Sequence, residues 1–176
     1  MRGAPSAAET GEARDARDAQ SLTFSLPDAS GKTVSASDLR GGLAVVLFFR
    51  GFWCAYCVEK LVRLEKLKAT DLEGVPVVAI SPDGPSAIRK GLDSVEKDRG
   101  VALTHRFLAD ETAVFSARYA LGTSGASRPP AMLLLDASGR IVWSLGESHY
   151  DKSPFEGSLR EALAGLSKKP PAPGRP

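Results

Sequence analysis

The sequence predicts an α/β domain with a mixed central β-sheet, helices on both faces and an N-terminal β-hairpin. An unbroken apolar run at residues 43–49 has the length of a strand. It has no polar side for solvent, which is typical of a central strand that is covered on both faces. A helical apolar period follows at 58–67, and a second apolar run at 75–80. Strand and helix signals that alternate in this way require a sheet with helices packed on it.

The chain before the central strand predicts the hairpin. Apolar and polar residues alternate at 22–26, residues 27–31 have turn composition, and residues 33–34 return as a short strand. The helix at 58–67 is expected to turn a charged face to solvent. That face comprises Glu59, Lys60, Arg63, Lys66 and Lys68.

The second half of the chain continues the alternation and ends in another hairpin. We expect a helix after Pro85, a short strand at 106–109 and a short helix at 112–121. Strands at 132–135 and 140–145 flank a turn and predict a hairpin. A final helix is expected from residue 154.

The composition of the two ends limits the folded domain to residues 21–166. Residues 1–20 alternate in charge without an apolar face, so we expect a disordered N-terminal segment. Residues 167–176 read SKKPPAPGRP, and so Pro-rich a stretch predicts a disordered tail.

Charge and hydropathy exclude several classes of partner. Lysine and arginine number 23 against 21 acidic residues, without a basic stripe, so no nucleic-acid partner is expected. No apolar run approaches the length of about 20 residues that spans a bilayer, so no membrane association is expected. The first 20 residues lack the apolar segment of a secretory signal, which predicts a cytoplasmic location.

The two cysteines, Cys54 and Cys57, are the candidate catalytic residues. A disulfide across so short a loop restricts the unfolded chain too little to be a structural staple. Cys54 falls between a strand and a helix, where free backbone N–H groups and the helix dipole stabilise a thiolate. Cys57 lies one turn later and is placed to attack a mixed disulfide formed by Cys54. The pair therefore predicts thiol–disulfide chemistry.

The alternative for a CxxC motif is half of a zinc site. A structural zinc ion needs four protein ligands, and only His105 and His149 add to the two cysteines. The two histidines lack the spacing of a ligand pair, and we expect both at the surface. The sequence therefore predicts neither a metal site nor a cofactor.

The segment FFRGFWCAYC at residues 48–57 resembles the thioredoxin-like superfamily. Its closest resemblance is to the alkyl hydroperoxide reductase/thiol-specific antioxidant (AhpC/TSA, peroxiredoxin-like or redoxin) family, whose members often read F-[FY]-R-G-x-W-C-P-Y-C. Ala55 replaces the usual proline. The resemblance covers about residues 20–166, including segments 108–110 and 130–136. It implies a thioredoxin-like fold and an oxidoreductase.

Departures from the peroxiredoxin pattern distinguish two activities within this family. The motif P-x-x-x-[TS]-x-x-C falls on Arg50, Cys54 and Cys57, so its proline and threonine are both replaced. The arginine that polarises peroxide in peroxiredoxins is replaced by Pro130. The resemblance implies that Pro130 is instead the cis-proline that packs against the sulfurs in thioredoxins, unless Pro129 and Pro130 merely punctuate a loop.

Three residues beside the cysteines are candidate substrate-binding groups together with Pro130. Arg50 is expected to stabilise a thiolate or an anionic substrate, or else to form a surface ion pair. Trp53 and Tyr56 are expected to form an apolar rim around the Cys54 sulfur, with a packing role as the alternative for Trp53.

These features together predict a thiol–disulfide oxidoreductase. Its expected substrate is a protein or small-molecule disulfide, and an external thiol reductant is its second partner. One alternative is a thiol-dependent peroxidase that reduces hydroperoxides through a sulfenic acid. The second alternative is a non-enzymatic redox-sensing module that uses the same disulfide as a switch.

Overall fold

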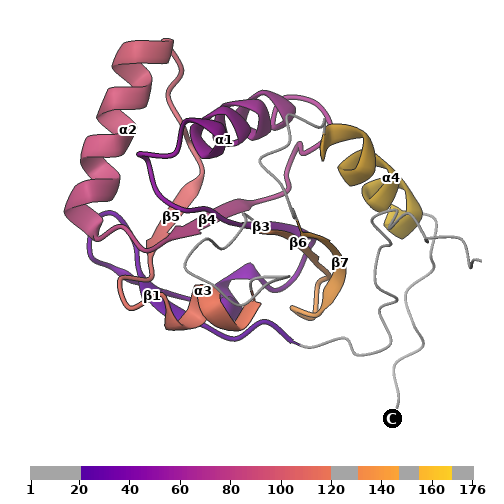
Figure 1. Cartoon of the computed structure of the whole chain (residues 1–176). Helices are drawn as coiled ribbons and strands as arrows, with labels where there is room; N and C mark the ends of the chain where they lie inside the picture. Colours follow the sequence, from indigo (N-terminus) through magenta and orange to yellow (C-terminus); the bar gives the residue numbers. More distant parts are fainter. Residues whose placement is uncertain (1–20, 120–130, 147–154, 168–176) are drawn as a thin grey trace, which may run out of the picture.

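A five-stranded mixed sheet forms the centre of the computed structural model, which describes residues 21–119, 131–146 and 155–167 (Figure 1). The strand order is β5-β4-β3-β6-β7. The strands are β3 (Ala44–Phe48), β4 (Val77–Ser81), β5 (Arg106–Ala109), β6 (Ala131–Leu135) and β7 (Ile141–Gly146). Strands β3, β4 and β5 are parallel to one another, and β6 and β7 add to β3 as an antiparallel hairpin. The predicted mixed sheet is confirmed.

Strand β3 is central because its sequence is apolar on both sides. All five of its residues are buried. Val45 and Leu47 pack into one core cluster, and Val46 and Phe48 pack into the other. This is the period-2 alternation of a strand, applied to a sheet that is covered on both faces.

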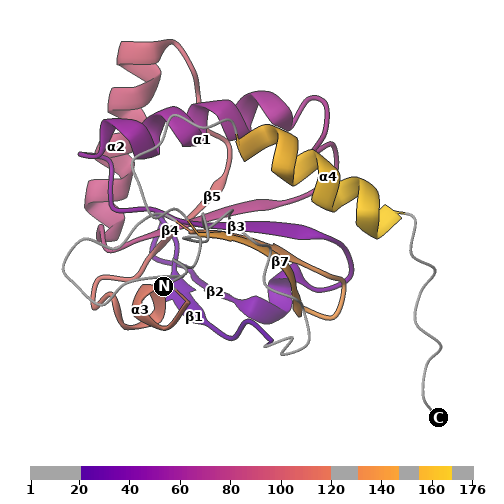
Figure 2. The same cartoon turned by 45° about the vertical axis from the view of Figure 1, so that its right-hand side comes forward.

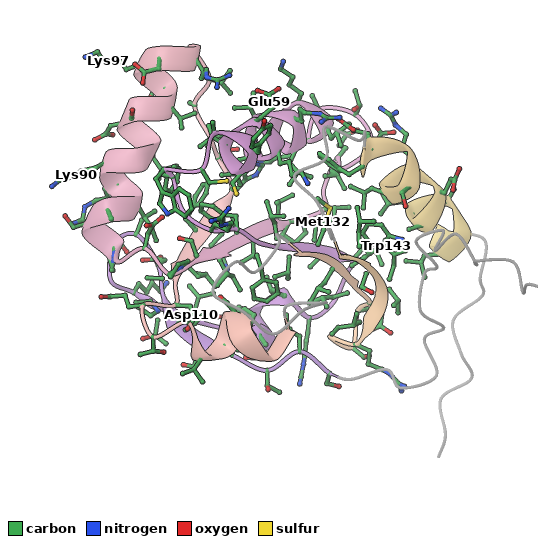
Figure 3. The ribbon with its side chains drawn as sticks, viewed as in Figure 1. Glu59, Lys90, Lys97, Asp110, Met132 and Trp143 are labelled. Carbon is green, nitrogen blue, oxygen red and sulfur yellow. The ribbon has the colours of Figure 1, made fainter. Side chains whose placement is uncertain are left out.

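Helices cover both faces of the sheet, as expected (Figure 2). The first face carries α1 (Ala55–Leu67), α2 (Pro85–Arg99) and α4 (Phe155–Ser167). The opposite face carries α3 (Val114–Tyr119), the hairpin of β1 (Ser25–Pro27) and β2 (Thr33–Ser35), and the short 3-10 helix η2 (Ala36–Leu39). Glu59 of α1 and Lys90 and Lys97 of α2 point outward from this layer (Figure 3).

The parallel strands bring three loops to one edge of the sheet. Loops that follow the carboxyl ends of β3, β4 and β5 begin at Phe49, Pro82 and Asp110. The first of these loops leads into α1 and the second into α2. In open α/β sheets this carboxyl edge is where functional groups gather.

Two turns have nearly the same sequence and the same hydrogen bonds. They are residues 28–32 (DASGK) and 136–140 (DASGR). In each turn one aspartate oxygen accepts the serine N–H, the serine hydroxyl and the N–H of the basic residue, at 2.6–3.0 Å. Gly31 and Gly139 adopt φ of +88° and +83°, which glycine reaches without strain. The repeated turn closes the β1–β2 and the β6–β7 hairpins.

The structure changes the limits of the short helix predicted at 112–121. The predicted domain limits, 21 and 166, stay a prediction. The expected helix at 112–121 begins at Val114, and it is described as far as Tyr119. The two predicted disordered ends lie outside the described residues, apart from Ser167. In the described part of the chain, no helix has the length and apolar character needed to cross a bilayer.

Candidate functional site: the thiol pair at the start of α1

Cys54 is the N-cap residue of α1, as the sequence predicted. Its backbone is extended, with φ −88° and ψ 100°, so the helix begins directly after it. The Cys54 N–H donates to the Gly51 carbonyl at 3.1 Å, and the Cys54 carbonyl accepts the Val58 N–H at 3.0 Å. The first turn of α1 therefore presents its free N–H groups beside this residue, where they favour negative charge.

Cys57 lies one turn into the helix and touches Cys54. Both residues are free thiols, and the Cys57 S–H donates to the Cys54 sulfur across 2.6 Å. Only 4% of Cys54 and 1% of Cys57 is exposed. The two sulfurs are thus brought together in a dry site, within reach of the disulfide that a dithiol enzyme forms.

The environment of the two thiols is unequal. Burial raises the pKa of Cys57 to about 12, and the hydrogen bond to Cys54 adds to this rise. A backbone hydrogen bond from Arg50 and the charge of its guanidinium oppose it. Cys57 is consequently protonated at neutral pH, whereas Cys54 occupies the helix terminus.

The turn before Cys54 is held by packing and by two hydrogen bonds, from the Cys54 N–H to the Gly51 carbonyl and from the Phe52 N–H to Asp83. Gly51 adopts φ +130°, a conformation that side chains disfavour. The Phe52 ring meets Phe49 and Phe107 at centroid distances of 5.4 and 5.6 Å. It also covers Gly91 of α2, where an added Cβ would lie 2.2 Å from the ring. This packing fixes the path of the chain into α1.

Three of the predicted binding residues, Arg50, Trp53 and Tyr56, lie within four positions of Cys54 along the chain. The Arg50 guanidinium lies 4.5 Å from the centre of the Trp53 ring. Trp53 is 67% exposed and Tyr56 is 47% exposed, although both are large and apolar. We call these three residues the rim. Pro130, the fourth predicted residue, lies outside the described residues.

Two sequence-based expectations about charged residues are wrong. Lys60, assigned to the outer face of α1, is 5% exposed because it lies on the same side of the helix as Cys57 and Leu64. His105, expected at the surface, is 7% exposed. Its Nε2 is 2.9 Å from the Leu61 carbonyl, and burial lowers the pKa of its ring. His149 lies outside the described residues.

Asp83 is a site residue that the sequence analysis missed. It follows β4, and its carboxylate accepts the Phe52 N–H at 3.1 Å. The partners are 31 positions apart, so no local pattern reports the contact. A usable signal was the parallel order of β3 and β4, which predicts that the loops after both strands share one edge. In the described part of the chain, no three histidine, cysteine or acidic side chains gather as a metal site.

Comparison with known proteins identifies the family of the chain. The AhpC/TSA family profile matches residues 18–144, which is more than half of the chain. A comparison with curated proteins found no significant match.

Solved structures of two kinds share the fold. AhpC of Enterococcus faecalis superposes with a TM-score of 0.73 at 17% identity, covering 85% of this chain and 92% of its own. The thiol peroxidase of Chromobacterium violaceum gives 0.67 at 15% identity, with 86% and 87% covered. A secreted Mycobacterium tuberculosis disulfide oxidoreductase homologous to E. coli DsbE gives 0.60 at 24% identity, with 82% and 97% covered. The family match, on a fold that peroxidases and disulfide oxidoreductases share, shows that the chain belongs to the AhpC/TSA family and is a thioredoxin-like thiol oxidoreductase.

Proposed function

We propose that the protein is a thiol–disulfide oxidoreductase in which Cys54 attacks the substrate and Cys57 resolves the intermediate. The observation that carries this proposal is the inequality of the two thiols. Cys54 caps α1, where a thiolate is stabilised, while burial raises the pKa of Cys57 to about 12. A dithiol enzyme needs this difference in protonation. The thiolate is the attacking species, and the second thiol must stay protonated until the mixed disulfide has formed.

The first step forms a mixed disulfide. The Cys54 thiolate attacks one sulfur of a substrate disulfide, a new S–S bond forms, and the other substrate sulfur leaves as a thiolate that takes up a proton. The contact between the cysteines assists this step, because the Cys57 S–H donates to the sulfur that carries the negative charge.

The second step releases the reduced substrate. The Cys57 thiol loses its proton and attacks the Cys54 sulfur of the mixed disulfide. A Cys54–Cys57 disulfide forms, and the remaining substrate sulfur leaves as a thiol. The substrate gains two electrons and the protein loses two. An external thiol reductant restores the dithiol by the reverse exchange.

Substrate binding is assigned to the rim and, from the resemblance, to Pro130. Trp53 and Tyr56 present exposed apolar area beside a buried sulfur. Arg50 adds a fixed charge that is held over the Trp53 ring. This surface suits a disulfide carried by a protein or by an anionic small molecule.

A thiol peroxidase is the second candidate, and the family match favours it. A hydroperoxide would oxidise one cysteine to a sulfenic acid, and the other would condense with it and release water. The peroxiredoxin motif places its attacking cysteine at Cys57. Burial raises the pKa of that thiol to about 12, so little of it is the thiolate that attacks peroxide at neutral pH.

Stopped-flow tryptophan fluorescence distinguishes the candidates, with Trp53 next to Cys54 as the reporter. Reduced protein is mixed with oxidised glutathione in one series and with hydrogen peroxide in another. Trp53→Phe identifies the signal of Trp143. We expect faster oxidation by the disulfide. Oxidation that is much faster with peroxide would support the peroxidase, and no reaction with either would favour a redox-sensing module.

A further inference from the structure

We propose that Asp83 is a positioning residue for Cys54, acting through the backbone of the turn that precedes it. The inference rests on the proposed attack by Cys54. Asp83 lies in the loop between β4 and α2, on a different part of the chain from the thiol pair. It reaches the turn at residues 51–54, which we call the redox turn, through one carboxylate oxygen, Oδ2, that accepts the Phe52 N–H.

The carboxylate is itself fixed at the end of β4. The Ser81 hydroxyl donates to Asp83 Oδ2 at 3.2 Å, and the Asp83 N–H is 3.3 Å from the same hydroxyl oxygen. Ser81 is fully buried, and it is the last residue of a central strand. The oxygen that accepts the Phe52 N–H is therefore anchored to the sheet rather than to a solvated side chain.

The opposing turn is shaped to receive this oxygen. A Cβ added to Gly51 would lie 3.0 Å from Asp83 Oδ2 and 2.8 Å from the Trp53 ring nitrogen. Any side chain at position 51 would therefore push against both groups. Glycine is required here for its φ of +130° and also for the close approach of the carboxylate.

The consequence for Cys54 follows from the short covalent path. Phe52 is two residues before Cys54, and the Cys54 N–H closes the same turn on the Gly51 carbonyl. The Phe52 ring is already fixed between Phe107 and Gly91, so the remaining freedom of the turn is in its backbone. The hydrogen bond to Asp83 removes that freedom and holds the Cys54 sulfur at the N-terminus of α1.

Two substitutions separate this role from a simple effect of charge. Asp83→Asn removes the negative charge and keeps an oxygen acceptor for the Phe52 N–H. Asp83→Ala removes both. Because both variants are uncharged, the difference between them isolates the acceptor. Asp83→Leu, which fills similar volume without an acceptor, repeats the test, and Asp93→Ala removes an exposed carboxylate of α2 as the matched control.

The experiment measures the rate of Cys54 alkylation by iodoacetamide against pH in the reduced full-length protein, with Cys57→Ser as the background. Circular dichroism and the melting temperature report folding. We expect Asp83→Ala and Asp83→Leu to slow alkylation at neutral pH by about threefold to tenfold, the size of one lost hydrogen bond. Their pH profiles shift upward, while Asp83→Asn stays within about twofold of the parent and Asp93→Ala matches it.

Two results would overturn the proposal. The first is an alkylation profile of folded Asp83→Ala or Asp83→Leu that matches that of Asp93→Ala. The second is an Asp83→Asn variant as slow as Asp83→Ala, since that would assign the effect to charge. Alkylation needs no physiological substrate, so a failure of disulfide exchange in the wild-type protein would refute the proposed function and leave this test intact.

Discussion

At the scale of single residues, two chemically identical side chains three positions apart occupy different environments. Cys54 stands outside the helix as its N-cap and Cys57 stands inside the helix, although both belong to the same buried core cluster. The helix terminus supplies uncompensated N–H groups to the first, and burial disfavours the charged form of the second. The proposed order of the two thiol reactions rests on this difference.

Arg50 is predicted to support the thiolate at the same site. Its charge opposes the rise in the pKa of Cys57, and its guanidinium is kept near by the Trp53 ring. We expect Arg50→Met to slow alkylation of the thiol pair at neutral pH by about threefold, because a favourable charge is lost. Arg50→Lys keeps the charge and should retain most of the rate. Equal rates for Arg50→Met and wild type would exclude this role.

The sequence predicted the position of Cys54 but not the surroundings of Lys60 and His105. A strand followed by a helix is a local signal, and it places a residue between them at the helix terminus. The burial of Lys60 depends on which residues pack against its side of α1. The burial of His105 depends on packing against α1, where its ring nitrogen lies in hydrogen-bond distance of the Leu61 carbonyl, 44 positions away. A charged residue in an amphipathic helix is usually solvated, so local patterning predicts the wrong environment for Lys60. His105 lies directly before β5, and its own segment carries no signal of the contact with α1.

At the scale of elements, α2 and the redox turn form one packed unit. Glycine inside a helix normally lowers the stability of the helix relative to alanine. At Gly91, however, the missing side chain leaves the space that the Phe52 ring occupies. The carboxylate of Asp83, just before α2, holds the same residue by its backbone. The turn is therefore positioned by an element that carries no reacting group.

Gly91→Ala tests this packing against a matched helical glycine. The added methyl would lie 2.2 Å from the Phe52 ring, so the ring must move. We expect a loss of about 1–3 kcal/mol in the free energy of unfolding, together with slower disulfide exchange. At Gly165 of α4 an added Cβ meets nothing within 4 Å. Gly165→Ala should therefore stabilise the protein by up to about 1 kcal/mol. Chemical denaturation measures both, and changes of the same sign would contradict the packing argument.

The repeated turn at 28–32 and 136–140 is also open to test. Burial alone would raise the pKa of Asp136, but the hydrogen bonds from Ser138 and Arg140 together outweigh it, so the pKa is lowered. We expect Asp136→Ala to reduce the free energy of unfolding by about 1 kcal/mol, since several donors lose their acceptor. Asp136→Asn keeps an acceptor and should lose less. A thermal melt that is unchanged in Asp136→Ala would show that the turn forms without these bonds.

At the scale of the whole molecule, the sequence predicted the layers but not the contacts between distant loops. Apolar runs and helical periods are local, and they were enough to predict a mixed sheet covered on both faces. The closeness of Asp83 and Phe52 comes from the parallel pairing of β3 with β4, which brings residues 31 positions apart together. Which side chains meet at that edge depends on exact packing, and no single segment of sequence encodes it.

The pH dependence of the free energy of unfolding tests the effect of the buried His105 on the stability of the whole fold. Burial lowers the pKa of His105 below the ordinary 6.5, so the unfolded chain binds this proton first as the pH falls. The free energy of unfolding should therefore decrease from pH 7 to about pH 5. Glu65 and Lys68 also act on the ring, in opposite directions.

His105→Gln removes the titrating group, and its unfolding free energy should be flatter over the same pH range. The lowered pKa values of Asp28, Asp136 and Glu65 remove stability only in more acidic solution, so they do not mimic this slope. Denaturant titrations at several pH values provide the measurement. Parallel curves for the variant and the wild type would contradict the assignment.

The measurement that tests the central claim most directly is the identification of the attacking sulfur. Reduced Cys54→Ser and Cys57→Ser variants are each mixed with oxidised glutathione, and the products are identified by intact-mass and peptide mass spectrometry. Cys57→Ser is predicted to accumulate one glutathione on Cys54, because attack proceeds and resolution is blocked. Cys54→Ser is predicted to remain largely unmodified, because Cys57 is buried and protonated. Rapid glutathione addition to Cys57 in the Cys54→Ser variant would contradict the proposed order of attack.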